Sequence, residues 1–200
     1  MNERVGAVVL AGGRSSRFGS DKLVAGLDGR PLLEHVLGAV RAVDPAIDVV
    51  VVSAPGVHRA VEPSVRVVAD ELAFGGPLAG LATGLAAIGP EIERVVVVGG
   101  DMPWLVPAVL GRMLAVLAAD QTVEAVALDD DGRTRPLPLA VRRVPAARAA
   151  AMMLAADDRR LHRLLDHLAT VVLSGTIWRS ADPGGASLRD VDTPADLIRG

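Results

Sequence analysis

Short valine-rich runs alternate with longer alanine- and leucine-rich stretches through the first part of the chain. Because β-branched residues favour strands and alanine and leucine favour helices, this alternation predicts repeated strand–helix units. Such units feed a mostly parallel sheet that helices bury on both faces. We expect strands at residues 5–10, 48–53, 65–69 and 94–98, and proline-opened helices at 31–43, 77–88 and 107–119.

The second half of the sequence is less regular. Residues 123–128 and 136–141 flank the turn sequence Asp129-Asp130-Asp131-Gly132, which predicts a hairpin-like excursion, antiparallel if the turn is tight. Helices are expected at 143–156 and 160–167, with a short last helix at 192–198. The expected fold class is therefore α/β, with a doubly wound, mostly parallel sheet, a small antiparallel excursion in the second half, and a single domain over residues 1–200.

Composition argues against several classes of partner. Hydrophobic residues make up 50% of the 200 residues, but no apolar run approaches the roughly 18 to 20 residues of a membrane-spanning helix. The first residues lack the basic flank and apolar length of a secretion signal, and the absence of cysteine excludes a disulfide framework. A net charge of -3 offers no excess of basic residues for the phosphates of a nucleic acid, and 2% aromatic residues leave few rings on which bases can stack. We expect a cytoplasmic protein that binds neither membrane nor nucleic acid.

The first expected strand runs into a glycine-rich loop, LAGGRSSRFGSDK, at residues 10–22. Gly12 and Gly13 allow backbone N–H groups to converge on an anion, and Arg17 and Lys22 add positive charge, so the loop is suited to phosphate. Lys22 is the only lysine among the 21 lysine and arginine residues. The spacing matches neither the Walker A motif nor a dinucleotide-binding turn. In the competing interpretation, the glycines only make a sharp strand exit and Lys22 is a solvated surface charge.

Two aspartates follow other expected strands. Asp101, in the sequence GGDMP, comes after the fourth strand, and one carboxylate beside bound phosphates is typical of a magnesium site. Asp70 follows the third strand and is suited to accept hydrogen bonds from the sugar or base of a nucleotide. Both lie where open α/β sheets bind ligands, at the carboxyl ends of strands. The alternatives are a turn cap for Asp101 and an ordinary polar strand exit for Asp70.

Two further motifs fit either ligand binding or structure alone. GGPLAG, at residues 75–80, opens a helix whose free N–H groups are available to an anion or a base edge, although tight packing against the sheet explains the same glycines. Asp190 and Asp192 point to the same side of an extended segment, so either one is able to complete a metal shell. Asp192 before Thr193 and Pro194 also fits a helix N-terminus. The four histidines show no metal-ligand spacing.

Together, LAGGRSSRFGSDK, GGPLAG, GGDMP and DVDTPADL resemble the motifs of the molybdenum cofactor guanylyltransferase (MobA) family, over nearly the whole chain. The resemblance implies a Rossmann-like nucleotidyltransferase fold and an enzyme that uses Mg²⁺. In that family the first loop holds GTP, and the phosphate of molybdopterin attacks its α-phosphorus to give a guanine dinucleotide and pyrophosphate. The implied partners are GTP and molybdopterin, and contacts with molybdoenzyme-maturation proteins are left open.

The resemblance also assigns roles to individual residues. Ser53 matches a position where relatives can carry asparagine in contact with the nucleotide. Asp190 is the alternative to Asp192 as a metal ligand. The candidate catalytic residues are Lys22, Asp101 and Arg17, and the candidate metal ligands are Asp101 and Asp192. The candidate nucleotide-binding residues are Leu10, Ala11, Gly12, Gly13, Lys22, Ser53, Asp70, Gly76, Gly80 and Asp101.

The identities of the base and of the acceptor are open at this level. The LAGG form of the first motif resembles the guanylyl branch. The related molybdopterin cytidylyltransferases have the form LAAG, with alanine at the position of Gly12. In contrast, DVDTP differs from the N-x-N-T-P that is frequent in MobA relatives and is closer to cytidylyl branches. The alternatives are a cytidylyltransferase or other NTP transferase acting on a different phosphorylated acceptor, and a non-catalytic GTP-binding module. Candidates for acceptor binding, or for ordinary surface arginines, are Arg133, Arg135, Arg142 and Arg143.

Overall fold

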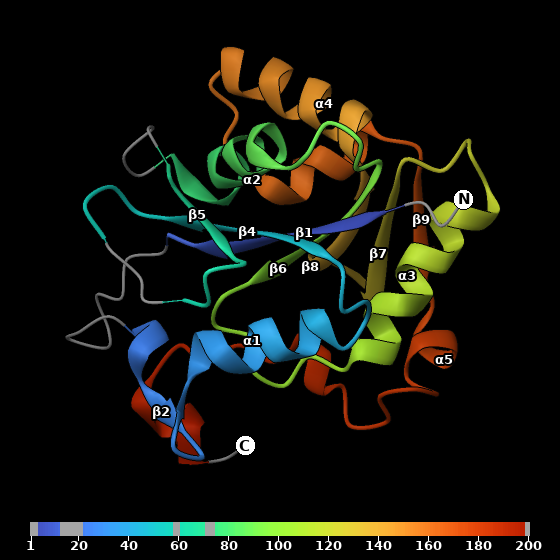
Figure 1. Cartoon of the computed structure of the whole chain (residues 1–200). Coiled ribbons are helices and arrows are strands. Elements are labelled where there is room, and N and C mark those ends of the chain that lie inside the picture. Colours follow the sequence, from blue (N-terminus) through green and yellow to red (C-terminus); the bar gives the residue numbers. More distant parts are fainter. Residues whose placement is uncertain (1–3, 13–21, 58–60, 71–74, 199–200) are drawn as a thin grey trace.

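The computed structural model describes residues 4–12, 22–57, 61–70 and 75–198. Its centre is a seven-stranded sheet in the order β5-β4-β1-β6-β8-β7-β9 (Figure 1). β8 is antiparallel to both of its neighbours, whereas the other strand pairs of this sheet are parallel. The strands are β1 (Val5–Ala11), β4 (Asp48–Ser53), β5 (Arg66–Ala69), β6 (Arg94–Gly99), β7 (Ala125–Asp130), β8 (Arg133–Arg142) and β9 (Thr170–Leu173).

Helices cover both faces of this sheet (Figure 1). One face carries α2 (Gly76–Ala87), α4 (Arg143–Ala155) and the 3₁₀ helix η2 (Leu161–His167), whose buried side chains form one core with the sheet. The opposite face carries α1 (Leu32–Arg41), α3 (Pro107–Ala119) and α5 (Gly175–Trp178), which share a second core. The predicted α/β fold with a doubly wound, mostly parallel sheet is confirmed.

The valine runs supply both cores at once. In β1, Val8 belongs to the core on the α2 side, whereas Ala7 and Val9 belong to the core on the α1 side. Because successive strand residues point to opposite faces, a strand that is covered on both sides needs apolar residues at every position. The valines at 49–52 and 95–98 meet the same requirement in β4 and β6, and each is at most 1% exposed.

Glycine lets α2 approach the sheet closely. A methyl group on Gly84 would overlap Val8 Cγ1 and would lie 2.9 Å from Val8 Cγ2 and 3.1 Å from Val52 Cγ2. One turn earlier, a methyl group on Gly80 would lie 3.3 Å from Leu10 Cδ2. Tight packing, one of the two interpretations of GGPLAG, is therefore observed at Gly80.

The second half of the chain completes the same sheet. β7 and β8 form the predicted hairpin, and β8 lies between β6 and β7, so the antiparallel excursion is continuous with the parallel strands. β9, which is not among the predicted strands, pairs with β7 at the edge. The remaining described elements are η1 (Lys22–Val24), the antiparallel pair β2 (Gly26–Leu27) and β3 (Arg30–Pro31), η3 (Ala186–Leu188) and η4 (Pro194–Ile198).

Two segments predicted to be helices form 3₁₀ helices. η2 buries Leu161 and Leu164, and this three-residue spacing matches the period of a 3₁₀ helix. η4 begins two residues later than predicted, at Pro194. The reason is that the Asp196 carboxylate accepts hydrogen bonds from the backbone N–H groups of Asp192 and Thr193, which hold these two residues outside the helix.

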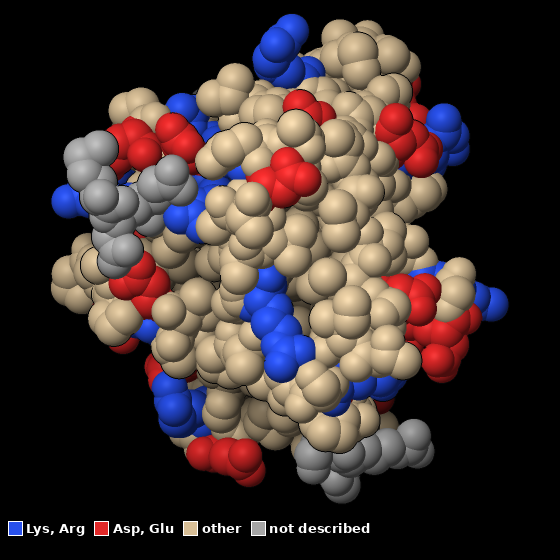
Figure 2. Space-filling view, turned by 90° about the vertical axis from the view of Figure 1, so that its right-hand side faces the viewer, with Lys and Arg blue, Asp and Glu red and all other residues tan. Residues whose placement is uncertain are grey.

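Charged side chains are scattered over the face shown in Figure 2, where described basic and acidic residues are interspersed and several of them lie side by side. A protein that binds nucleic acid through its phosphates gathers its basic residues into a patch or stripe, which this face does not show among the described residues. Within the described ranges, the helices are too short or too polar to cross a membrane.

Candidate active site

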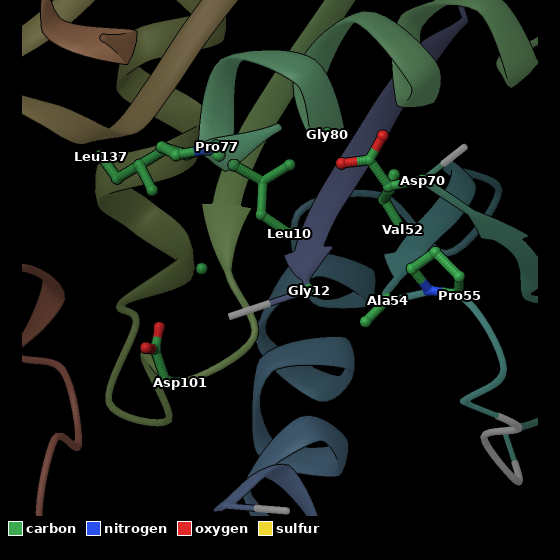
Figure 3. A pocket seen from close by; sticks show the side chains of 12 residues that line it. Leu10, Gly12, Val52, Ala54, Pro55, Asp70, Pro77, Gly80, Asp101 and Leu137 are labelled. Atoms are coloured by element: carbon green, nitrogen blue, oxygen red, sulfur yellow. The ribbon is translucent and has the colours of Figure 1, made fainter. Parts of the chain in front are cut away.

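A cavity of about 540 Å³ lies at the carboxyl ends of β1, β4, β5 and β6 (Figure 3). The chain passes from β1 to β4 on one side and later to β6 on the other, and ligands of open α/β sheets bind at such a reversal. The volume is within the usual range for small-molecule sites. The wall consists of Leu10, Gly12, Val52, Ala54, Pro55, Asp70, Gly76, Pro77, Gly80, Gly99, Asp101 and Leu137.

Most of the predicted nucleotide-binding residues within the described ranges line this cavity. Ala11 and Ser53 do not, since they are 2% and 1% exposed and alternate with cavity-lining neighbours along β1 and β4. Lys22 is also absent from the wall and instead contacts Asp101, which lines the cavity. Gly13 and Arg17 lie outside the described residues. The predicted residues found in the wall are Leu10, Gly12, Asp70, Gly76, Gly80 and Asp101.

Asp70 places a carboxylate in the cavity wall away from Asp101, and in Figure 3 these two aspartates lie at opposite ends of the labelled set. The backbone N–H of Asp70 donates to the carbonyl of Ser53 at 2.8 Å, which fixes the residue at the end of β5. Thr83 Oγ1 lies 3.5 Å from Asp70 Oδ1 and donates a long hydrogen bond to it. The residue is only 9% exposed, so its carboxylate favours a ligand that brings N–H or O–H donors.

At the other end of the cavity, three carboxylates gather around one ammonium. Asp101, Asp190 and Asp192 each offer an oxygen, and these oxygens lie within 4.8 Å of one another. Lys22 Nζ lies 2.6 Å from Asp101 Oδ2, 3.0 Å from the carbonyl oxygen of Val191 and 3.5 Å from Asp192 Oδ1. Of the three predicted catalytic residues, the structure thus brings Lys22 and Asp101 together with both aspartates of the late motif.

Lys22 and Asp190 in this cluster both have raised pKa values. Burial acts to lower the pKa of the Lys22 ammonium, but the hydrogen bond and charge of Asp101, together with Asp192, outweigh burial and raise it. Burial raises the pKa of Asp190, and the negative charges of Asp192 and Asp101 raise it further. Among the described residues of this cluster, three carboxylates accompany one ammonium, so the cluster favours an additional cation, and oxygen ligands of this kind suit Mg²⁺.

Backbone contacts hold the late segment against the end of β6. The N–H of Val191 donates to the carbonyl of Asp101 at 2.9 Å. The Val191 side chain is fully buried in a small core with Leu27 and Leu32, against which Trp104 packs. The Asp196 carboxylate caps η4, so helix capping does not require the Asp192 carboxylate, which faces Lys22. Asp190 and Asp192 therefore both belong to the cluster, which leaves either one able to serve as a metal ligand.

The prediction did not include the wall that β8 contributes. Leu137 lines the cavity because β8 pairs with β6, a contact between segments far apart in sequence. Nothing in the local sequence PLPL indicates this position. The loop residues Ala54 and Pro55 were also missed, although their place directly after β4 is a signal that they lie at the ligand-binding edge.

A mostly parallel seven-stranded sheet covered on both faces, with a cavity and a carboxylate cluster at the carboxyl ends of its strands, is the arrangement of α/β nucleotidyltransferases, and this chain has that fold. Within the class, the chain belongs to the family described as "MobA-like NTP transferase domain", whose sequence profile matches residues 7–171.

Individual relatives agree with this family. The chain is 33% identical to a probable molybdenum cofactor guanylyltransferase of Chloroflexus aggregans, over 95% of this chain and 90% of the relative. It is 35% identical to another from Natronomonas pharaonis, over 100% of this chain and 97% of the relative. The crystal structure of molybdopterin-guanine dinucleotide biosynthesis protein A from Archaeoglobus fulgidus superimposes with a TM-score of 0.77 at 23% identity, covering 97% of this chain and 95% of that one, and shares the fold.

Proposed function

We propose that this protein transfers GMP from GTP to the phosphate of molybdopterin, giving the guanine dinucleotide cofactor and pyrophosphate. Relatives that match the chain over almost its full length carry the name molybdenum cofactor guanylyltransferase, which supports this reaction. The observation that carries the proposal is the position of Asp101. It lines the nucleotide-sized cavity and also belongs to the carboxylate cluster beside Lys22, so one side chain connects a nucleotide site to a cation site.

In this proposal the nucleoside lies toward Asp70 and the phosphates lie toward Asp101. Leu10 and Val52 supply apolar wall between the two ends, which suits a base and a sugar. Gly12, at the end of β1, offers backbone without a side chain where phosphates pass.

The donor set fits Mg²⁺, which prefers a few carboxylate oxygens and keeps its other positions for water and phosphate. Asp101 would hold it together with Asp190 or Asp192, and the bound ion would neutralise phosphate charge. Lys22 is the chain's own cation at this place, and its flexible stem lets the ammonium turn from the carboxylates toward the phosphates.

In this reaction the protein aligns the two substrates and neutralises phosphate charge, and it forms no covalent bond with either substrate. An oxygen of the acceptor phosphate attacks the α-phosphorus, a new P–O bond forms, and the α–β P–O bond breaks as pyrophosphate leaves with the electron pair. Because the attacking phosphate is already ionised, no side chain has to remove a proton. Lys22 and the backbone near Gly12 are placed to stabilise the charge that builds on the α-phosphate oxygens.

The experiment that tests this function is pyrophosphate release from GTP, CTP or ATP in the presence of molybdopterin, with and without Mg²⁺. We expect turnover with GTP and Mg²⁺, and loss of about a hundredfold or more in Asp101→Asn because a metal ligand is removed. Asp131→Asn is the matched control, since Asp131 lies in the exposed β7–β8 turn at a positive φ of 51°, which asparagine tolerates. An Asp101→Asn enzyme that keeps near-normal turnover and thermal stability would remove the basis of the proposal.

Base choice is a separate outcome of the same assay. The DVDTP motif is closer to the cytidylyl branch. Preference for CTP in this assay would therefore assign the protein as a cytidylyltransferase with the same catalytic residues. A methyl group on Gly12 would lie 3.6 Å from the Ala54 nitrogen, an ordinary contact, so Gly12→Ala is compatible with the fold. If this position sets guanine preference, the ratio of kcat/KM for GTP over CTP falls in Gly12→Ala. An unchanged ratio assigns base choice to other residues.

We also propose that one domain over residues 1–200 performs this reaction in the cytoplasm. A single seven-stranded sheet takes strands from both halves of the chain, which supports one folding unit. The absence of cysteine from the sequence agrees with a reducing compartment.

A further inference from the structure

A second, smaller cavity of about 220 Å³ adjoins the nucleotide cavity. Asp101 and Leu137 line both cavities, so the two spaces meet at the carboxylate cluster. Met102 and Leu188 make the second cavity largely apolar, and Asp190 faces it beside Asp101. Among the described residues that line this cavity, Arg135 is the only basic one.

The guanidinium of Arg135 is weakly held. Its Nη1 lies 3.9 Å from Asp130 Oδ2, and its side chain is 40% exposed. The other oxygen of Asp130 accepts a hydrogen bond from Arg179 Nη2 at 2.8 Å, so Asp130 already has a stronger partner. The Arg135 guanidinium donates no hydrogen bond to another described residue, so its N–H groups are available to a ligand.

The other arginines around this hairpin are engaged or point elsewhere. Arg142 is buried and donates to the backbone carbonyls of Val123, Leu117 and Asp120. Arg143 donates to backbone carbonyls near the start of β6, from Nε at 2.8 Å and from Nη2 at 2.9 Å. Arg133 is exposed and is absent from the wall of the second cavity. Among the four candidates, Arg135 alone lines the second cavity.

We propose that the second cavity receives the phosphorylated end of the acceptor and that Arg135 binds its phosphate next to the carboxylate cluster; this rests on the proposed function. A guanidinium matches phosphate with two parallel N–H···O bonds, which fixes the direction from which a phosphate oxygen approaches the α-phosphorus. The apolar wall suits a phosphomonoester with an apolar neighbouring group. Since 220 Å³ is less than half of the nucleotide cavity, only the phosphate and its nearest atoms enter, and the rest of the acceptor lies outside.

The carboxylates make this anion site dependent on cations. Asp101 and Asp190 face the same cavity as Arg135 and would repel a phosphate, although Lys22 lies 2.6 Å from Asp101 and offsets part of that charge. A phosphate is therefore expected to bind more tightly when Mg²⁺ is present, because the ion neutralises the carboxylates that lie beside it. Asp190 is a positioning residue in this arrangement, through the ion that it helps to hold.

Binding of phenyl phosphate, a small phosphomonoester with an apolar body, tests the proposal without turnover. Calorimetric titration is carried out with the wild-type protein, Arg135→Gln and Arg133→Gln, in the presence of Mg²⁺ and α,β-methylene-GTP. A lost charge-assisted phosphate contact at a partly exposed site is expected to weaken binding by about tenfold in Arg135→Gln. Arg133→Gln removes the same charge from the same strand outside the cavity and is expected to bind within about twofold of wild type. Arg135→Lys keeps the positive charge but loses the paired N–H groups of the guanidinium, so its affinity for phenyl phosphate should lie between those of Arg135→Gln and Arg133→Gln.

Equal binding by the wild type and Arg135→Gln would overturn the proposal, as would an equal loss in Arg133→Gln, which would show a general charge effect. In the turnover assay, Arg135→Gln should raise the KM for molybdopterin by about tenfold and leave the KM for GTP unchanged. If the wild type releases no pyrophosphate with molybdopterin, the proposed function fails, while the phenyl phosphate titration still decides whether Arg135 binds a phosphate.

Discussion

Raising the pH through the lysine range titrates one side chain in this protein, because the chain has a single lysine, no tyrosine and no cysteine. Arginine side chains lose their protons only above about pH 12, and the α-amino group loses its proton near pH 8. Lys22 is therefore the one side chain that loses its proton between roughly pH 9.5 and 11.5. In the folded protein the pKa of Lys22 is raised above 10.5, because Asp101 and Asp192 outweigh the opposing effect of burial. Lys22 is 12% exposed, so solvent screens this pairing only in part.

The sign of the effect follows from the raised pKa. The stability that protonated Lys22 contributes is fully present below its unfolded pKa near 10.5 and is lost as the pH rises through the higher folded value. One proton limits the slope to about 1.4 kcal/mol of unfolding free energy per pH unit. We expect the wild type to lose stability in this window with a slope below that limit, and Lys22→Gln to show an almost flat profile.

Urea unfolding followed by tryptophan fluorescence measures these profiles, since Trp178 is fully buried and reports on the folded state. Lys22→Gln should also be less stable than the wild type at neutral pH, because three carboxylates then face one another without an ammonium. Added Mg²⁺ should recover part of that loss. An equal alkaline loss in Lys22→Gln and the wild type would refute the assignment of this stability to the Lys22 cluster.

Further predictions concern packing and buried charge. Gly84→Ala is expected to destabilise the protein by about 1 to 3 kcal/mol, because the new methyl group would overlap Val8 in the sheet. Gly111→Ala, in α3 where nothing lies within 4 Å of the new methyl group, should instead stabilise by about 0.5 to 1 kcal/mol, and urea unfolding of both variants checks the pair. Arg142→Gln should cost about 2 to 4 kcal/mol in the same assay, because it leaves buried carbonyls unsatisfied, and a loss below about 0.5 kcal/mol would contradict this.

The parallel strands and their helices were predictable because each one has a local signal. The strand at 48–53 and the helix at 107–119 match their predicted bounds, the first through consecutive valines and the second through its opening Pro107. The place of β8 had no such signal, because it depends on pairing with β6 across some 45 positions of sequence, such as Val95 with Val141. β9 has only four residues and one of its valines is exposed, so its pattern is too short to distinguish from a loop.

The site was predictable in its residue types but not in its assembly. Asp101 and Lys22 follow a strand and a glycine-rich loop, and both positions are marked by local sequence. Their meeting with Asp192 depends on the Val191 N–H to Asp101 carbonyl bond and on a small core around Val191, which are contacts between distant segments. Ser53 alternates along β4 with residues that line the cavity and is itself 1% exposed, so its side chain is not in the wall, and its contact with the nucleotide stays a prediction.

The two sides of the site are also separated in the order of synthesis. Every residue in the wall of the nucleotide cavity, up to Leu137, precedes β9, whereas Asp190 and Asp192 follow it. A growing chain therefore has the residues of its nucleotide cavity, with Asp101 and Lys22, before it gains the other two carboxylates of the cluster. A fragment cut between β9 and Asp190 keeps all strands of the seven-stranded sheet but only one carboxylate of the cluster, so the cluster forms only when the last segment docks through the hydrogen bond from Val191 to Asp101.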